Sequence, residues 1–443
     1  MTPRPAHLPR EAALEIVALA AALLFDNGQT TQQMVAAGER LGRALGTPVT
    51  LLPRWEEIAV QVADTPFSEI VRAKPLGVDM RKVMAVLTII DDVCTGKLRG
   101  DAARAALEAV KHVPLASTPR FALFAAIGGA ALGVIFGALD AASLLLIAFS
   151  AGAGGLLRRW LATTTGNPFA QTLCAAALAG AVGALAVSFR LSAAPSLVAL
   201  CPCMVLVPGP HILNGALDLV RTRITLGIAR LTYAALIVLM ICVGLLLGFP
   251  PGLASFPAGA LPPPVPLGPD VIAAGCAVSA YGTFFSIPWR LVPLPIAVGM
   301  LAHATRWVLI SLAGLHVGAA TLFACTLVGF IATPVAHRLR LPFAAFGFSA
   351  VVSMMPGFFL FGCATDLVAL LSLGDRAPAE LPAHIMANGT TAFLITLAMT
   401  IGLILPRMLI EHVLPPWVRG RRERSAQQRI ADQPTGYDPA DLL

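Results

Sequence analysis

The chain has 443 residues, of which 57% are hydrophobic and only 12% are charged, and its mean hydropathy is +0.79. A soluble core cannot bury so large an apolar fraction, and several apolar runs approach the ~20 residues that span a bilayer. The composition therefore excludes an ordinary soluble protein and predicts a polytopic membrane protein. The net charge of +7 favours cytoplasmic loops over nucleic-acid binding, because the arginines cluster beside apolar runs and in the C-terminal tail.

The eight cysteines do not indicate a metal site or a disulfide framework. Seven of them lie in apolar stretches without C-x-x-C spacing, and we interpret them as small packing residues. The close pair Cys201-Pro202-Cys203 lacks further metal-ligating side chains in its neighbourhood. We therefore expect no cofactor and no metal.

Residues 1–118 are more polar than the rest and predict a small α+β domain. A helix around residues 16–23 should end at Asp26-Asn27-Gly28, and a second helix should cover residues 31–45. Strands over 49–52 and 58–62 and helices over 79–93 and 101–112 follow. The first apolar run, residues 12–25, contains Glu15 and is followed by polar sequence rather than a cleavage site, so it does not resemble a secretory signal.

Ten apolar runs follow this domain and predict a mainly α-helical membrane region. They cover residues 121–139, 141–157, 168–188, 194–220, 224–248, 270–287, 291–313, 316–336, 342–372 and 383–408. A Pro- and Gly-rich linker without Lys or Arg, residues 250–269, separates two units of five spans, residues 119–249 and 270–410. The polar tail, residues 411–443, is predicted to be disordered.

The arginines test this topology. Those at positions 158, 159, 221, 223, 290, 338, 340 and 419–424 fall on the side of the N-terminal domain. Only Arg190 and Arg376 fall in loops on the other side. By the positive-inside rule, both termini should be cytoplasmic and the linker external.

A motif recurs once in each unit. Val207-Pro208-Gly209-Pro210 is echoed by Met355-Pro356-Gly357-Phe358, and an Asp-Leu-Val triplet follows each Pro-Gly at the same distance. Pro and Gly break helices, so each motif predicts a discontinuous span. Because five spans is an odd number, the second unit should be inverted relative to the first, as is typical of alternating-access transporters. Chance recurrence of Pro-Gly is the alternative.

If both spans are broken, their second halves should begin at Pro208 and Pro356. The N–H groups at such helix starts carry partial positive charge, and two of them meeting near the midplane could hold a carboxylate. We therefore predict a small anionic or zwitterionic substrate, bound near Pro208, Gly209, Pro356 and Gly357.

Two aspartates and one histidine are candidates for gating or proton coupling. Asp218 and Asp366 each lie ten residues beyond their Pro, which is ~15 Å along a helix. They should therefore lie towards opposite mouths, either as functional carboxylates or as ordinary solvated helix ends. His303 could carry a proton or serve as a packing histidine.

Further polar side chains within the spans are candidates for substrate contact. Arg306 lies inside the seventh span, where a charge needs a partner or a cavity. His211 and Asn214 follow the first Pro-Gly within two turns. Asn388 could line the outward path or, equally, join two helices by a hydrogen bond. Arg230, close to the end of its span, is expected to snorkel to the cytoplasmic surface.

Several of these motifs resemble one known family. Three parts of the chain are similar to the bacterial threonine/serine exporter family in its fused two-unit form. They are the segment 14–46 with Asp26-Asn27-Gly28-Gln29-Thr30-Thr31, the motif Val207-Pro208-Gly209 with the following Asn214, Gly215 and Asp218, and residues 342–372. The resemblance implies export of threonine and serine across the inner membrane, driven by the proton motive force. Split relatives are linked instead with dicarboxylates such as succinate, and the broken helices do not choose between these substrates.

The expected partners are thus a small amino acid or carboxylate, protons and the lipid bilayer, with no nucleic acid; a homo-oligomer is left open. A membrane-embedded enzyme is the competing class, but the chain has no H-E-x-x-H, G-x-S-x-G or P-loop motif. A passive channel or a receptor is the third class. Flux measured with and without a proton gradient separates these possibilities.

Overall fold

The structure is a computed structural model that describes residues 9–63, 67–114, 116–249, 265–339, 342–354 and 356–413. Most of the predicted external linker, most of the tail, and Met355 of the second Pro-Gly motif lie outside these residues.

The N-terminal domain contains four helices and a three-stranded sheet. Its elements are α1 (Arg10–Asp26), α2 (Thr31–Ala44), β1 (Val49–Pro53), β2 (Glu57–Val62), β3 (Ser68–Arg72), α3 (Met80–Cys94) and α4 (Gly100–Lys111). The sheet is an antiparallel meander of order β1-β2-β3, with Leu51 opposite Val60 and Ala59 opposite Ile70. The side chain of Asp79 accepts hydrogen bonds from the N–H groups of Arg81 and Lys82 and so caps α3.

Strand β3 was not predicted from the sequence. It is an edge strand whose residues alternate between exposed and half-buried, so it lacks the strong apolar alternation that identifies a strand with one buried face. The other six elements of the domain lie where the sequence places them, with ends that differ by a few residues.

All ten apolar runs are helical. The first unit consists of α5 (Thr118–Ile135), α6 (Ala141–Thr164), α7 (Pro168–Ser188), α8 (Pro195–Met204), α9 (Gly209–Val220) and α10 (Ile224–Gly248). The second consists of α11 (Leu267–Phe284), α12 (Pro293–Ser311), α13 (Val317–Leu339), α14 (Phe343–Val351), η1 (Val352–Met354), α15 (Gly357–Leu373), η2 (Gly374–Arg376) and α16 (Leu381–Val413). Among the described residues, eight helices are long and apolar enough to cross a membrane, and the bent pair α8 and α9 makes a ninth. Helix α11, which carries Asp270 in its first turn, is not among them.

The two units pack in the same pattern. Helix α5 packs on α6, α6 on α7, and α7 on α10, and likewise α11 packs on α12, α12 on α13, and α13 on α16. The short helix α8 contacts the first three helices of its unit, as α14 does in the second, and α9 and α15 each pack against the last helix. This correspondence is what an internal repeat produces.

Glycines bring the last helix of each unit close to its third helix. A Cβ added to Gly244 of α10 would lie 2.3 Å from the carbonyl oxygen of Leu173 in α7, and one added to Gly402 of α16 would lie 2.9 Å from that of Leu322 in α13. Small residues permit such close approach of membrane helices. Close packing matters there because lipid is as apolar as the side chains, so the hydrophobic effect does not drive the helices together.

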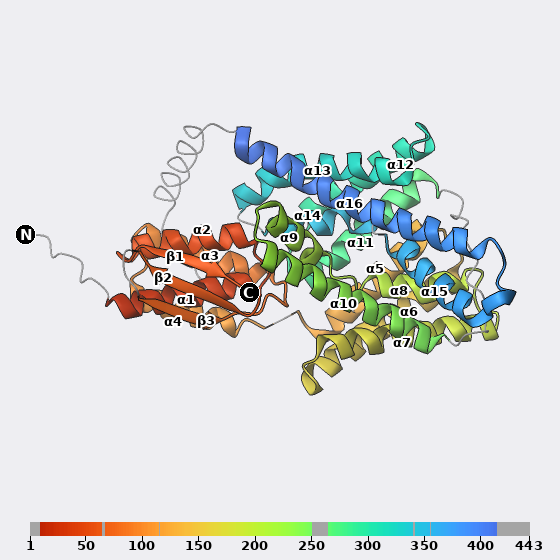
Figure 1. Ribbon diagram of the computed structural model, residues 1–443, viewed down its shortest axis with the longest axis horizontal. Helices are drawn as coiled ribbons and strands as arrows, with labels where there is room; N and C mark the ends of the chain where they lie inside the picture. The colour runs from red at the N-terminus through yellow and green to blue at the C-terminus, as the bar shows by residue number, and fades with distance from the viewer. Residues whose placement is uncertain are drawn as a thin grey trace, which may run out of the picture.

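The helices on either side of the two Pro-Gly motifs lie side by side. Helix α8 packs against α15, and α9 packs against α14, so the helix before each motif accompanies the helix after the other. In Figure 1, α9 and α14 lie towards the N-terminal domain, whereas α8 and α15 lie farther from it along the long axis.

The N-terminal domain rests directly on the helices. The N–H of Met80, at the start of α3, donates to the carbonyl of Phe285 just after α11, at 2.9 Å. Trp55 in the β1–β2 turn contacts the ring of Tyr233 in α10, with the centroids 5.5 Å apart. Leu226, near the start of α10, belongs to the apolar core of the domain.

Candidate functional site

The two Pro-Gly motifs lie at breaks between short helices. The chain is not helical between α8 and α9, and the two helices are bent by 52°. Pro208 and Pro356 are the N-cap residues of α9 and α15, whose first helical residues are Gly209 and Gly357. The second half-helices thus begin one residue later than the sequence predicted.

Each motif glycine is packed against a side chain of the other unit. A Cβ on Gly209 would lie 1.7 Å from the ring of Phe348 in α14, and a Cβ on Gly357 would lie 2.7 Å from Met204 at the end of α8. The Tyr281 hydroxyl of α11 donates to the Met204 carbonyl at 3.0 Å. The two breaks are therefore neighbours across the interface between the units, and they are tightly closed.

The first turn of α9 has fewer free N–H groups than the sequence suggested. The N–H of Gly209 bonds the carbonyl of Val207 at 3.0 Å, and that of His211 bonds the carbonyl of Pro208 at 3.1 Å. Pro210 has no N–H at all. An anion at this helix start would find these donors already engaged.

A buried cluster forms around Asp218 in α9. Its carboxylate accepts a hydrogen bond from the hydroxyl of Thr31 at 3.0 Å and forms an ion pair with Nε of Arg230 in α10 at 3.1 Å. Asp218 and Arg230 are only 3% and 1% exposed. Arg230 therefore does not snorkel to the surface as expected, because the Asp218 carboxylate neutralises its charge inside the protein.

This cluster joins the two segments that the sequence analysis singled out separately. Asn214 donates through Nδ2 to the carbonyl of Gly28 at 3.3 Å, one turn from Asp218. Gly28 and Thr31 belong to the loop and helix start after α1, whereas Asn214 and Asp218 belong to α9. His211, one turn earlier, packs edge-on against Tyr233. These polar residues thus lie at the contact between the N-terminal domain and the helices.

A small cavity adjoins the same cluster. Its lining comes from the start of α2, the last turns of α9 and the last helix, and comprises Thr30, Thr31, Gln32, Asn214, Leu217, Asp218, Arg221 and Arg407. Arg407 is 1% exposed and its guanidinium lies 4.6 Å from the ring centroid of Phe343.

A second buried chain of polar groups lies beside the second break. His303 of α12 pairs through Nε2 with Asp270 of α11 at 2.9 Å, and its Nδ1 lies 3.1 Å from the hydroxyl of Ser353 in η1. Ser353 is three residues before Pro356. Arg306 lies one turn after His303 on the same helix, and its Nε is buried without a hydrogen-bond partner. Arg306 thus belongs to the second unit.

Asp366 and Asn388 also come together. Nδ2 of Asn388 in α16 donates to Oδ2 of Asp366 in α15 at 3.2 Å. Asp218 and Asp366 lie in α9 and α15, the helices that follow the two Pro-Gly motifs, and among the described contacts of these two carboxylates it is Asp218 that bonds the N-terminal domain, through Thr31. The two carboxylates are therefore in different parts of the helical region.

Asp270, Ser353 and Thr31 were missed by sequence reasoning. Asp270 stands at the boundary of an apolar run, where an acidic residue is ordinary. Thr31 was named as the start of a helix and within the segment that resembles the exporter family, but not as a partner of a buried carboxylate. Isolated serines in apolar runs carry no signal. Among the described residues, no three His, Cys, Asp or Glu side chains are grouped closely enough to hold a metal ion.

Comparison with known protein families gives two matches that together cover most of the chain. Residues 15–250 match a family described as "Putative threonine/serine exporter", and residues 270–409 match one described as "Threonine/Serine exporter, ThrE". The first match ends and the second begins at the two ends of the predicted linker, residues 250–269. No solved structure matches the chain.

Proposed function

Because the chain belongs to the threonine/serine exporter family, we propose that it exports threonine and serine and that protons moving inward drive the export. The family match and the apolar helices make it a multi-pass membrane exporter of a small molecule. The choice of threonine and serine follows the family descriptions, and the coupling to protons is our inference from the residues around His303.

We propose that the two units are inverted repeats that alternate access around the two breaks. The pairing of α8 with α15 and of α9 with α14 supports this inversion, since each broken span runs beside the other in the opposite sense. Gly209 and Gly357, each sealed by a side chain of the other unit, are where the units would part to admit a substrate. Pro208 and Pro356 would act as the hinges, because neither can continue a helix from the preceding turn.

The aspartates at the two ends of this path would act as gates. Asp218, held by Thr31 and Arg230, would close the path on the side of the N-terminal domain. Asp366, held by Asn388, would close it on the other side. His211 and Asn214 would belong to the first gate, since they lie in the same contact.

The observation that carries the proton coupling is the bridge formed by His303 between Asp270 and Ser353. An imidazole gains and loses a proton near neutral pH and can hold a partner on each nitrogen. Protonation of His303 would strengthen its pairing with Asp270 and leave Nδ1 as a donor to Ser353, beside the second break.

The test is release of labelled threonine from right-side-out membrane vesicles with and without an inward proton gradient. We expect the gradient to accelerate release by the wild type. His303→Gln should lose this acceleration while keeping exchange of internal for external threonine, because Gln retains hydrogen bonding but does not titrate. His316→Gln is the matched control, since His316 is exposed and bonds only the nearby N–H of Gly318.

Other outcomes would decide against parts of the proposal. Gradient-driven release by His303→Gln would exclude His303 from coupling. Release by the wild type that ignores the gradient would indicate a channel. Succinate release without threonine release would identify a dicarboxylate exporter, and no flux of threonine, serine or succinate would refute transport of these substrates.

A further inference from the structure

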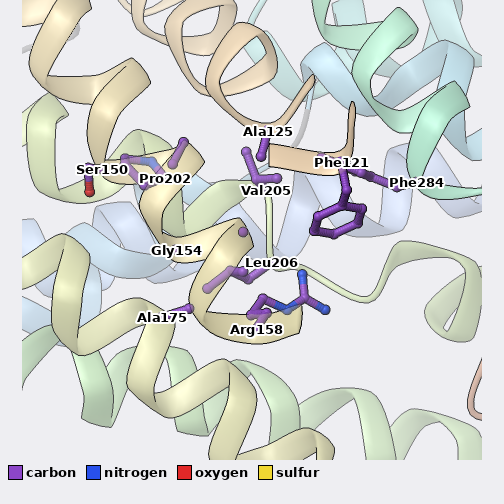
Figure 2. A pocket seen from close by; sticks show the side chains of 12 residues that line it. Phe121, Ala125, Ser150, Gly154, Arg158, Ala175, Pro202, Val205, Leu206 and Phe284 are labelled. Carbon is purple, nitrogen blue, oxygen red and sulfur yellow. The ribbon is translucent and has the colours of Figure 1, made fainter. Parts of the chain in front are cut away.

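A cavity in the first unit lies directly beside the turn that precedes the first Pro-Gly motif. Its walls come from α5, α6, α7, the end of α8 with the following turn, and the end of α11. Figure 2 shows the lining side chains, among them Ser150, Arg158, Pro202, Val205 and Leu206. Val205 and Leu206 are the residues that connect α8 to Pro208, so movement at the break changes the shape of this cavity.

Arg158 is the charged residue of the cavity. Its Nε is buried without a hydrogen-bond partner, and none of the residues that line the cavity is acidic. The rest of the side chain is half-buried. A guanidinium that lies partly inside a helical bundle is costly unless an anion accompanies it. The described protein supplies no such anion.

A second polar residue lines the same cavity. Ser150 is 1% exposed, and its hydroxyl is buried without a hydrogen-bond partner. Ser150, Gly154 and Arg158 follow one another at four-residue spacing, so they share one face of α6. Gly154, which has no side chain, leaves the face open between the hydroxyl and the guanidinium. One helix thus presents an unpaired cation and an unpaired hydroxyl to one space.

The cavity is narrow in this structure. Its volume is about 10 Å³, by a measure in which one water molecule needs roughly 10–15 Å³. A threonine would therefore enter only when the walls separate. The non-helical part of the wall is the turn at Val205 and Leu206, which lies next to the proposed hinge at Pro208.

From these observations we propose that Arg158 and Ser150 form a subsite for the substrate, in which Arg158 binds the carboxylate and Ser150 bonds a polar group of the same molecule. This inference rests on the proposed export function and names the substrate contact that function requires. It moves the anion-binding role from the first turn of α9, whose N–H groups are engaged, to a guanidinium of α6 that shares a cavity with Val205 and Leu206.

The test compares Arg158→Gln with Arg159→Gln in counterflow of labelled threonine into proteoliposomes. Arg159 is the matched control, because it precedes the same loop but stacks on the ring of Phe121 at 4.5 Å and does not line the cavity. We expect the apparent KM of Arg158→Gln to rise about tenfold or more, equivalent to about 1.4 kcal/mol for each factor of ten. Arg158→Lys should recover part of the affinity, and Arg159→Gln should resemble the wild type.

Threoninol, which lacks the carboxylate, separates substrate binding from other roles of Arg158. We expect it to inhibit the wild type weakly and to inhibit Arg158→Gln to the same extent, because the lost contact is with the carboxylate. If Arg158 instead paired with a lipid phosphate, threonine and threoninol would lose affinity equally, and the proposal would be overturned. An unchanged KM in a folded Arg158→Gln protein would overturn it as well.

Ser150→Ala provides a second variant, which leaves the charge in place and should raise KM by a smaller factor. Size-exclusion profiles and thermal unfolding of each purified variant show whether it is folded. If Arg158→Gln does not fold, Arg158→Lys replaces it in the measurement of KM. Failure of the proposed function is distinguishable, because then the wild type itself carries neither threonine nor succinate. The subsite alone would be refuted if the wild type carried either substrate and Arg158→Gln, Arg158→Lys and Ser150→Ala all carried it with the same KM.

Discussion

The ion pair between Asp218 and Arg230 leads to a sharp prediction about stability. Asp218→Asn removes the negative charge but keeps an oxygen that can accept the hydrogen bond from Thr31. Arg230, 1% exposed, would then be a buried cation without its counter-ion. Breaking a buried pair in this way costs about 3–5 kcal/mol. We expect a loss of that size in the free energy of unfolding.

A double-mutant cycle isolates the pair from the rest of the cluster. Arg230→Gln alone should be as harmful as Asp218→Asn alone, since each leaves the other charge unpaired. The double variant buries neither charge, so its loss should be smaller than the sum of the single losses by about 2 kcal/mol or more. Equilibrium unfolding of the purified protein in mixed micelles with increasing SDS provides the measurement.

Arg223 is the internal control, because it approaches the same carboxylate but only to 3.8 Å, with 30% of its side chain exposed. Arg223→Gln should cost less than about 1 kcal/mol, as surface pairs do. If the losses of Asp218→Asn and Arg230→Gln add in the double variant to within about 0.5 kcal/mol, the two charges do not stabilise each other and our account of this cluster is wrong.

Two further predictions concern the first break and the N-terminal domain. Gly209→Ala should slow threonine counterflow and lower the free energy of unfolding by roughly 1–3 kcal/mol, because its Cβ would lie 1.7 Å from the Phe348 ring. Adding Phe348→Ala should restore activity in part, and a double variant without recovery would show that the ring is not the obstacle. Gly268→Ala is the control and should have no effect, since its Cβ meets nothing within 4 Å. Burial raises the pKa of Asp26 to about 6, against a weaker lowering by a backbone hydrogen bond from Lys74. The folded state holds this proton more tightly than the unfolded state, so the free energy of unfolding should fall as pH rises from about 4 to about 6 and level off above. The expected fall is roughly 2 kcal/mol, once solvent screening of the half-buried group is allowed for. Asp26→Asn should remove this part of the pH dependence in SDS unfolding curves; an unchanged difference between pH 4 and pH 7 would contradict the assignment.

The arrangement of polar contacts suggests why the N-terminal domain is attached to this exporter. The loop after α1 and the start of α2 contact Asn214 and Asp218, which lie one turn apart on α9. Any movement of α9 at the break therefore acts on these contacts. A transporter without the domain would lack Thr31 as a partner for Asp218.

The sequence by itself determined the membrane class, the α+β domain at the N-terminus and the positions of nearly all helices. These features follow from local patterns, since a run of apolar residues, a helical period or a Pro-Gly break is visible within twenty residues. The edge strand β3 escaped because a half-exposed strand has little apolar periodicity. The recurrence of Pro-Gly at equal distance from Asp218 and Asp366 likewise required no structure.

Only the tertiary structure decided which polar groups meet. Asp218 is 187 residues from Thr31, and His303 is 50 residues from Ser353. A polar residue in an apolar run indicates that a partner is needed, but the packing of the helices determines which residue that partner is. For that reason the sequence identified His303 as a candidate but not its partner Asp270. In the sequence Arg158 resembles any other cytoplasmic charge, and only the fold shows that it lines a cavity without a carboxylate.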